Sequence, residues 1–127
     1  MKAGVLKETW PGEARVAVVP AAVPAFKRAG VEVMVEAGAG LAAGFRDTEY
    51  EEKGARVAGR AEVLSSATLL LSVRSLAGGH DAEAIAQLGS DHVVLGFLDP
   101  LGSPEGVKTL AARGATAFSV EMVPRIT

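Results

Sequence analysis

The chain has 127 residues, 49% of them hydrophobic and 22% charged, which is enough for one domain with a hydrophobic core and argues against disorder. Its net charge of −2 gives no electrostatic reason to expect a nucleic acid or an anionic lipid surface as a partner. The absence of cysteine excludes disulfides, thiol catalysis and thiolate metal sites. No signal-peptide pattern is present, and no apolar run approaches the roughly 20 residues of a membrane span, so we expect a soluble cytoplasmic domain.

Short apolar runs alternate with helical segments along the whole chain. The expected strands are 3–6, 31–35, 55–57, 68–73, 92–98 and 115–120. The expected helices are 21–29, 47–53, 60–66, 81–88 and 103–113. Asp47, Asp81 and Ser103 are good N-cap residues for three of these helices. Strands alternating with helices predict an α/β domain with a parallel sheet that is covered on both faces.

The loop 36–46 contains a cluster of glycines after a strand, which partly matches the phosphate-binding fingerprint of dinucleotide-binding folds. Gly44 comes one position late, however, and the next helix begins only at Asp47. No acidic residue ends the following strand about 20 residues on, where a ribose contact would be expected. We therefore favour a structural glycine loop. His80 and His92 have no ligand at metal-binding spacing, so no metal site is expected.

Charged residues follow the ends of three predicted strands. Lys7 and Glu8 follow the first strand, Arg74 follows the fourth and Asp99 follows the fifth. Because the carboxyl ends of parallel strands meet at the same edge of a sheet, we expect these side chains to line one cleft. The alternative is that they are ordinary solvated loop residues.

Arg15 lies between Ala14 and the apolar run 16–19, so its head should be held near an apolar surface. A guanidinium in that setting binds a carboxylate or a phosphate in a fork. A structural pair with Glu8 or Glu13 explains the residue equally well.

Three segments resemble the family of alanine dehydrogenases and nicotinamide nucleotide transhydrogenase α subunits. They are Lys7-Glu8 with Pro11-Gly12-Glu13-x-Arg15-Val16-Ala17-x-x-Pro20, the loop Glu36-Ala37-Gly38-Ala39-Gly40, and the ending Glu121-Met122-Val123-Pro124-Arg125-Ile126-Thr127. The resemblance covers essentially the whole chain. It implies a three-layer, flavodoxin-like α/β domain with a mostly parallel sheet. Residues 1–127 would be the N-terminal lobe of a two-lobed NAD(H)-binding subunit, whose Rossmann lobe is absent from this chain.

The resemblance also separates the two branches of the family. In alanine dehydrogenases, the position matching Arg15 binds the substrate carboxylate, a lysine stands where this chain has Arg74, and a catalytic histidine stands where it has Asp99. An aspartate cannot replace a histidine as proton donor at neutral pH without a large pKa shift. Direct hydride transfer between two nicotinamides needs no acid or base on the protein. The resemblance therefore favours the transhydrogenase branch.

On this basis the chain is expected to be part of a proton-translocating NAD(P) transhydrogenase α subunit that passes a hydride from NADH to NADP. The intact subunit would hold NAD(H) and form a homodimer, and an NADP-binding partner subunit would hold NADP(H). Through its partner subunits it would lie on the cytoplasmic, inner face of the membrane. The alternatives are the N-terminal domain of an alanine dehydrogenase, which deaminates alanine to pyruvate, and a non-enzymatic assembly or regulatory module.

The site residues implied by the resemblance contact the cofactor or line the cleft, and none is assigned as catalytic. Arg125 and Arg15 would bind the cofactor. The cleft candidates are Lys7, Glu8, Arg74 and Asp99. By itself the chain is expected to be inactive and to bind NAD poorly.

Overall fold

The computed structural model describes residues 1–124, which form a six-stranded parallel sheet in the order β3-β2-β1-β4-β5-β6. The strands are β1 (Lys2–Val5), β2 (Glu32–Glu36), β3 (Arg56–Ala58), β4 (Leu69–Leu71), β5 (Val93–Gly96) and β6 (Thr116–Ser119). The α-helices are α1 (Val23–Arg28), α2 (Asp47–Glu52), α3 (Arg60–Ser66), α4 (Ala82–Ala86) and α5 (Pro104–Ala112). Short 3-10 turns are η1 (Pro20–Ala22), η2 (Leu41–Ala43), η3 (Ala77–Gly79) and η4 (Val120–Met122). The predicted α/β fold with a parallel sheet is confirmed.

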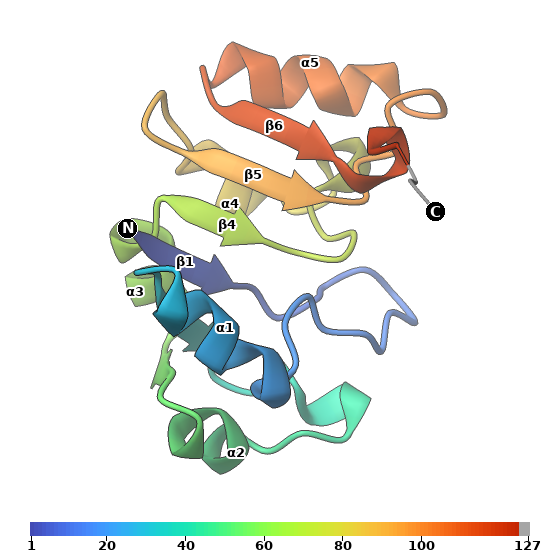
Figure 1. Ribbon diagram of the computed structural model, residues 1–127. Coiled ribbons are helices and arrows are strands. Elements are labelled where there is room, and N and C mark those ends of the chain that lie inside the picture. Colours follow the sequence, from blue (N-terminus) through green and yellow to red (C-terminus); the bar gives the residue numbers. More distant parts are fainter. Residues whose placement is uncertain (125–127) are drawn as a thin grey trace.

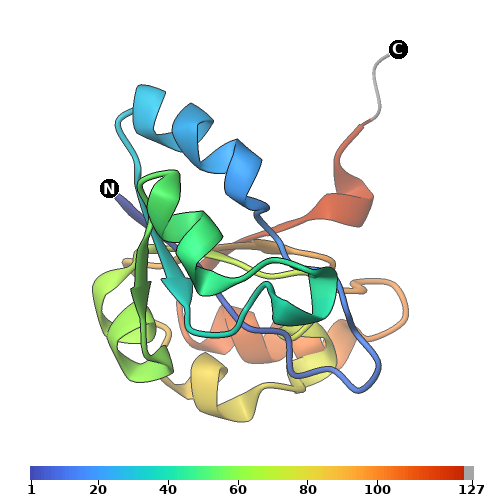
Figure 2. The same cartoon turned by 90° about the horizontal axis from the view of Figure 1, so that it is seen from below.

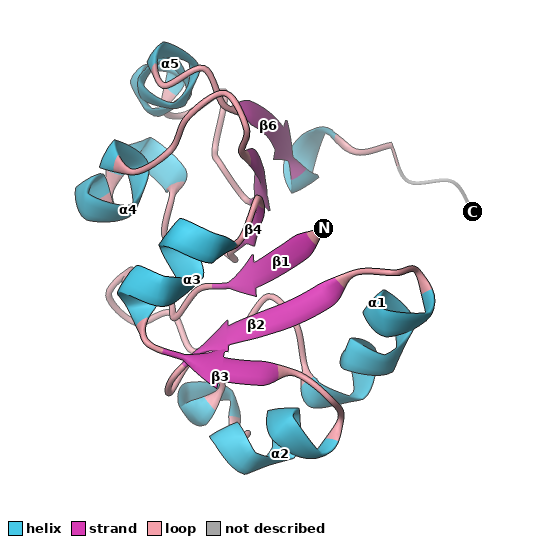
Figure 3. Cartoon of the chain, turned by 90° about the vertical axis from the view of Figure 1, so that its left-hand side faces the viewer, coloured by secondary structure: helices cyan, strands magenta, loops and turns pink. Residues whose placement is uncertain are grey.

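Each face of the sheet has its own hydrophobic core. Leu70 and Val94 pack with α3, α4 and α5 on one face, whereas Val5 and Val35 pack with α1 and α2 on the other. Figure 2 shows the two helical layers on opposite sides of the sheet, and Figure 3 shows the same arrangement along the strands. Gly4 lets α3 approach β1 closely, because a Cβ at this position would lie 2.8 Å from the Ala67 Cβ atom.

The order of the strands places a topological switch between β1 and β4. From β1 the chain continues through α1 on one face, and from β4 it continues through α4 on the other. The carboxyl ends of these neighbouring strands therefore border a crevice, which is where open α/β sheets bind ligands. Without the edge strand β3, the order is that of the five-stranded flavodoxin-like sheet.

One half of the sheet is less covered than the other. In Figure 1, α1 lies in front of the sheet, whereas β5 and β6 have no helix of residues 1–124 in front of them. On this half, Phe97 and Phe118 are 38% and 55% exposed. No helix within the described residues combines the length and the apolar character that crossing a membrane requires.

The three predicted helix caps have different outcomes. The N-cap position of α2 belongs to Arg46, and Asp47 is the first helical residue, because its carboxylate accepts the N–H group of Gly38 instead (2.9 Å). Ser103 precedes α5 as expected, but its side chain makes no capping hydrogen bond. The third prediction is confirmed: the Asp81 carboxylate accepts the N–H group of Ala84 at the start of α4 (3.1 Å).

Candidate functional site

Two neighbouring hollows open at the carboxyl ends of the strands. The first, here called the rim cleft, encloses about 400 Å³ and is lined by Trp10, Arg15, Arg74, Ala77, Phe97, Asp99 and Glu121. The second encloses about 230 Å³ and is lined by Lys7, Glu8, Glu13, Arg15, Gly38, Ala39, Leu41 and Ala42. Arg15 lines both. The structure thus brings the four charged residues expected at this edge, together with Arg15, around two adjoining hollows.

Arg15 grips a neighbouring carboxylate in a fork. Its Nε atom lies 2.9 Å from Glu13 Oε2, and its Nη2 atom lies 2.9 Å from Glu13 Oε1. The guanidinium carbon also lies 5.6 Å from the centre of the Phe97 ring, and the side chain remains 62% exposed. The hydrogen bonds from Arg15 lower the pKa of Glu13 from 4.5 to about 2, and the same contact raises the pKa of Arg15. The structural pair with Glu13 is therefore real, and it leaves Arg15 at the surface of the cleft.

Arg74 is held from two sides. Its guanidinium carbon lies 4.4 Å from the centre of the Trp10 ring, a cation–π contact. Its Nη1 atom lies 3.9 Å from Glu13 Oε1. The Trp10 ring in turn contacts the His80 ring, with the ring centres 4.9 Å apart. The loop that follows β1 thus supplies both a flat support and a counter-charge to Arg74.

Asp99 has a left-handed backbone, with φ of 50°, which is uncommon for a residue other than glycine. Its N–H group donates to Glu121 Oε2 (3.0 Å), and its own Oδ1 atom accepts the N–H group of Gly102 (3.2 Å). Burial alone would raise the pKa of Glu121, but hydrogen bonds from Ser119, Asp99 and Leu98 outweigh it and lower this pKa. The position of Asp99 is therefore defined by contacts on both of its sides.

Glu8 fastens the loop after β1 to the loop after β4. Its carboxylate accepts the backbone N–H groups of Val73 (2.9 Å), Arg74 (2.7 Å) and Ser75 (3.0 Å), and also the Ser75 hydroxyl (3.1 Å). These contacts engage both carboxylate oxygens. Glu8 thus supports Arg74, although it also lines the smaller hollow. Lys7 has an exposed side chain, and its backbone N–H group donates to Glu36 (2.7 Å).

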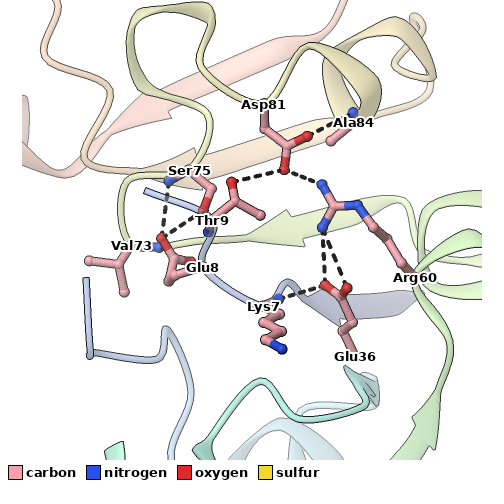
Figure 4. A network of polar contacts seen from close by, with 9 residues as sticks. All are labelled: Lys7, Glu8, Thr9, Glu36, Arg60, Val73, Ser75, Asp81 and Ala84. Atoms are coloured by element: carbon pink, nitrogen blue, oxygen red, sulfur yellow. Dashed lines mark hydrogen bonds and ion pairs between the residues drawn. The ribbon is translucent and has the colours of Figure 1, made fainter. Parts of the chain in front are cut away.

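A partly buried polar network at the ends of β1 and β2 was not predicted (Figure 4). Arg60 pairs with Glu36 (3.2 Å between Nη1 and Oε2) and with Asp81, and both carboxylate residues are only 7% exposed. Thr9 donates its N–H group to the Ser75 hydroxyl (2.7 Å) and its hydroxyl to Asp81 (3.4 Å). Burial would lower the pKa of Arg60, but the hydrogen bond and charge of Asp81 raise it. The network joins the ends of β1 and β2 to α3 and α4.

The sequence did contain a signal for this network. Arg60 is the first residue of α3, where the positive end of the helix dipole disfavours a cation. A cation placed against the local preference indicates a tertiary partner. The partners themselves, Glu36 and Asp81, lie 24 and 21 positions away and follow no local pattern.

The glycine loop is structural. The N–H groups of Gly38 and Ala39 donate to Asp47 (2.9 Å) and to the Glu36 carbonyl (2.9 Å), so these groups are already used within the protein. A Cβ atom at Gly40 would lie 2.8 Å from the Tyr50 ring. These contacts support the structural interpretation over a phosphate-binding loop.

Arg125, the first of the predicted cofactor-binding residues, lies outside the described residues. Within residues 1–124, no three histidine, aspartate or glutamate side chains are grouped so that they could hold a metal ion. The cleft chemistry described above rests on arginine, carboxylate and aromatic side chains alone.

The comparisons with known proteins agree with one another. An NAD(P) transhydrogenase α-subunit protein from Rickettsia prowazekii is 35% identical over 130 residues, which is 100% of this chain and 33% of that protein. Alanine dehydrogenase from Mycobacterium tuberculosis is 32% identical over 124 residues, 97% of this chain and 32% of that protein. A crystal structure of transhydrogenase from Sinorhizobium meliloti superposes with a TM-score of 0.90 at 38% identity, covering 100% of this chain and 37% of that one.

The chain thus spans about a third of the length of these relatives. Residues 4–127 match the family described as "Alanine dehydrogenase/PNT, N-terminal domain". The match covers nearly the whole chain, and the solved relative has the same arrangement of strands and helices. The protein belongs to the family of alanine dehydrogenase/PNT N-terminal domains.

Proposed function

We propose that residues 1–127 are the N-terminal lobe of a two-lobed subunit, the α subunit of a proton-translocating NAD(P) transhydrogenase. The observation that carries the proposal is the lining of the rim cleft, where Arg74 and Asp99 stand beside Arg15. The described lining includes no imidazole, whereas deamination of an amino acid needs a group that exchanges a proton near neutral pH. The identities of the relatives point the same way, with 35% and 38% for transhydrogenases and 32% for alanine dehydrogenase.

The cleft suits the nicotinamide end of NAD(H). Its volume of about 400 Å³ is within the usual range for a small-molecule site, and Arg15 and Arg74 offer donors beside an aromatic surface. The glycine loop does not suit a diphosphate, because the N–H groups of Gly38 and Ala39 are already paired. The second lobe would therefore hold the rest of the nucleotide.

In this proposal the lobe binds and orients and does not carry out acid–base chemistry. When bound, NADH supplies the hydride and NADP accepts it. Arg15, fixed by Glu13, and Arg125 would orient the nicotinamide end. Arg74, fixed by Trp10 and Glu8, would form the adjoining side of the cleft. The remaining cleft candidates are Lys7 and Asp99.

The proposed partners are an NADP(H)-binding subunit, membrane subunits that move protons, and a second copy of the intact subunit. A subunit with these partners would lie at the cytoplasmic, inner face of the membrane. The names of the relatives, which describe an α subunit, support a multi-subunit assembly. The net charge of −2 supports the absence of a nucleic-acid partner.

An activity assay tests the proposal. The full-length subunit, combined with its NADP-binding partner, should transfer hydride from NADH to NADP and should not reduce NAD with alanine. Replacing Arg15 with alanine should lower kcat/KM about tenfold or more, because an oriented charge-assisted hydrogen bond would be lost. Glu52→Gln on the exposed surface of α2 is the control and should change nothing.

The second candidate is alanine dehydrogenase, which is favoured by the relative at 32% identity. Alanine-dependent NAD reduction by the full-length subunit would establish it and would contradict the transhydrogenase proposal. The third candidate is an assembly or regulatory module. A subunit that is inactive in both reactions and yet forms a stable complex with a partner would favour this candidate.

A further inference from the structure

The charged groups around the rim cleft are unequal in number. Counted over the rim cleft and the adjoining hollow, Lys7, Arg15 and Arg74 supply three cationic groups, whereas Glu8, Glu13, Asp99 and Glu121 supply four carboxylates. The pKa values of Glu13 and Glu121 are lowered by their hydrogen bonds, so both are ionised at neutral pH. The two arginines are charged at any physiological pH. The described groups therefore leave the cleft with an excess of negative charge.

The arginines are also already paired. Arg15 makes its fork with Glu13, and Arg74 lies 3.9 Å from the same carboxylate. Glu13 therefore neutralises part of their charge, so the arginines attract a second carboxylate less strongly than unpaired arginines would. A carboxylate ligand would also approach Asp99 with nothing to donate, since an ionised carboxylate only accepts hydrogen bonds. Such a ligand is attracted only weakly and meets like-charge repulsion.

A primary carboxamide fits the same surroundings better. Its oxygen accepts a hydrogen bond from a guanidinium, and its NH₂ group donates to a carboxylate. The rim cleft offers both, with Arg15 and Arg74 as donors and Asp99 as an acceptor. The group is neutral, so it meets no repulsion from the excess of carboxylates.

Asp99 is held so that it can act as a fixed acceptor. Its backbone has the left-handed conformation, and its N–H group donates a hydrogen bond to Glu121. One of its carboxylate oxygens accepts a hydrogen bond from the N–H group of Gly102. A Cβ atom at position 102 would lie 2.6 Å from both Asp99 carboxylate oxygens, so a larger residue there would displace the Asp99 side chain. A residue kept in an uncommon conformation at a cleft indicates a functional constraint.

We propose that Asp99 determines specificity in the rim cleft, by admitting a nicotinamide nucleotide that ends in a carboxamide and rejecting one that ends in a carboxylate. The inference rests on the proposed function and adds a selectivity to it. The rejection arises from charge repulsion, and the acceptance from the paired donor and acceptor.

The test compares two nucleotides that differ in one group, NADH and its analogue with nicotinic acid in place of nicotinamide. Dissociation constants are measured by calorimetry on the full-length subunit. We expect the wild type to bind NADH at least tenfold more tightly than the acid analogue. Asp99→Asn should reduce this preference at least fivefold, mainly by tightening the acid analogue. Asparagine is suited to the same backbone conformation, so the variant should fold.

Two controls separate the local charge from other effects. Glu52→Gln makes the same charge change on the exposed surface of α2 and should leave the preference within twofold of wild type. In the wild type, the preference should shrink as the ionic strength rises from about 0.05 M to about 0.5 M, because salt screens repulsion at a partly exposed site.

The outcomes are distinguishable. Equal binding of the two nucleotides by the wild type, or an unchanged preference in a folded Asp99→Asn variant, would overturn this inference and leave the proposed function standing. Failure of the wild type to bind either nucleotide would overturn both.

Discussion

Some residues at the cleft contact more than one partner, and Glu13 is the clearest example. It accepts the Arg15 fork and lies 3.9 Å from Arg74, so one carboxylate positions both arginines. Its side chain is only 5% exposed, whereas that of Arg15 is 62% exposed. The arrangement leaves the guanidinium available to a ligand while its counter-charge stays covered.

The lowered pKa of Glu13 predicts a contribution to stability that depends on pH. The folded pKa is about 2 against an ordinary value of 4.5, so the contribution is complete above pH 4.5 and is lost as the pH falls toward 2. The Glu13→Gln variant should lack this pH-dependent contribution to stability. At neutral pH it should cost less than about 1 kcal/mol, because the Arg15 half of the pair is solvated.

Urea unfolding of both proteins between pH 6 and pH 2 measures the difference. The two curves of unfolding free energy should converge as the pH falls. A constant gap over the whole range would contradict the predicted role of Glu13.

At the scale of elements, α2 supports the segment that carries Arg15. Tyr50 of α2 is fully buried, and its hydroxyl donates to the carbonyl of Val18 (2.7 Å). Burial, with smaller contributions from Asp47 and Glu49, raises the pKa of Tyr50 to about 12. Gly40 lies against the same ring, so the glycine loop, α2 and the segment before η1 form one packed unit.

Tyr50→Phe should destabilise the protein by about 1–3 kcal/mol, because it leaves the buried Val18 carbonyl without its partner. Ser65→Ala is the matched control: it removes a hydroxyl from an exposed position on α3 and should cost less than about 0.5 kcal/mol. Denaturant unfolding measures both. Equal stability of Tyr50→Phe and wild type would show that the hydroxyl does not hold this segment.

At the scale of the whole molecule, the domain would offer one side of the binding site of the proposed subunit. The rim cleft opens at the carboxyl end of the sheet. In the glycine loop, the N–H groups of Gly38 and Ala39 already donate hydrogen bonds within the protein, so they are not available to a phosphate. The face of β5 and β6 beside the rim cleft carries Phe97 and Phe118, which are 38% and 55% exposed. The relatives are about three times as long as this chain. In the proposed subunit, the additional residues would form the second lobe, which this domain would face.

Titration of NADH into the 127-residue chain tests this view. We expect no binding in the micromolar range, because in the proposed function the cleft would contact one end of the nucleotide only. Trp10 is the only tryptophan and lies at the cleft, so quenching of its fluorescence reports binding directly. A micromolar dissociation constant would refute the argument that a second lobe is required.

Much of the fold and the location of the candidate site could be predicted from local patterns. Apolar runs predict the positions of all six strands, because burial on both faces of a parallel sheet needs continuous apolar residues. Once the sheet is parallel, charges that follow strands must gather at one edge, which placed Lys7, Glu8, Arg74 and Asp99 together. The prediction that Asp47 caps α2 failed because it relied only on adjacent residues. In the structure, the Asp47 carboxylate accepts a hydrogen bond from Gly38, which lies on the preceding loop.

The sequence by itself determined the α/β class, the family and the edge of the sheet where the charged residues gather, because these follow from apolar periodicity and from motifs of adjacent residues. Only the tertiary structure decided which charges pair. Glu8 reaches the N–H groups of residues 65 to 67 positions away, and Arg60 joins Glu36 to Asp81 across two elements. These pairs depend on the order of strands in space, which brings β1 beside β4, and no local pattern encodes that order.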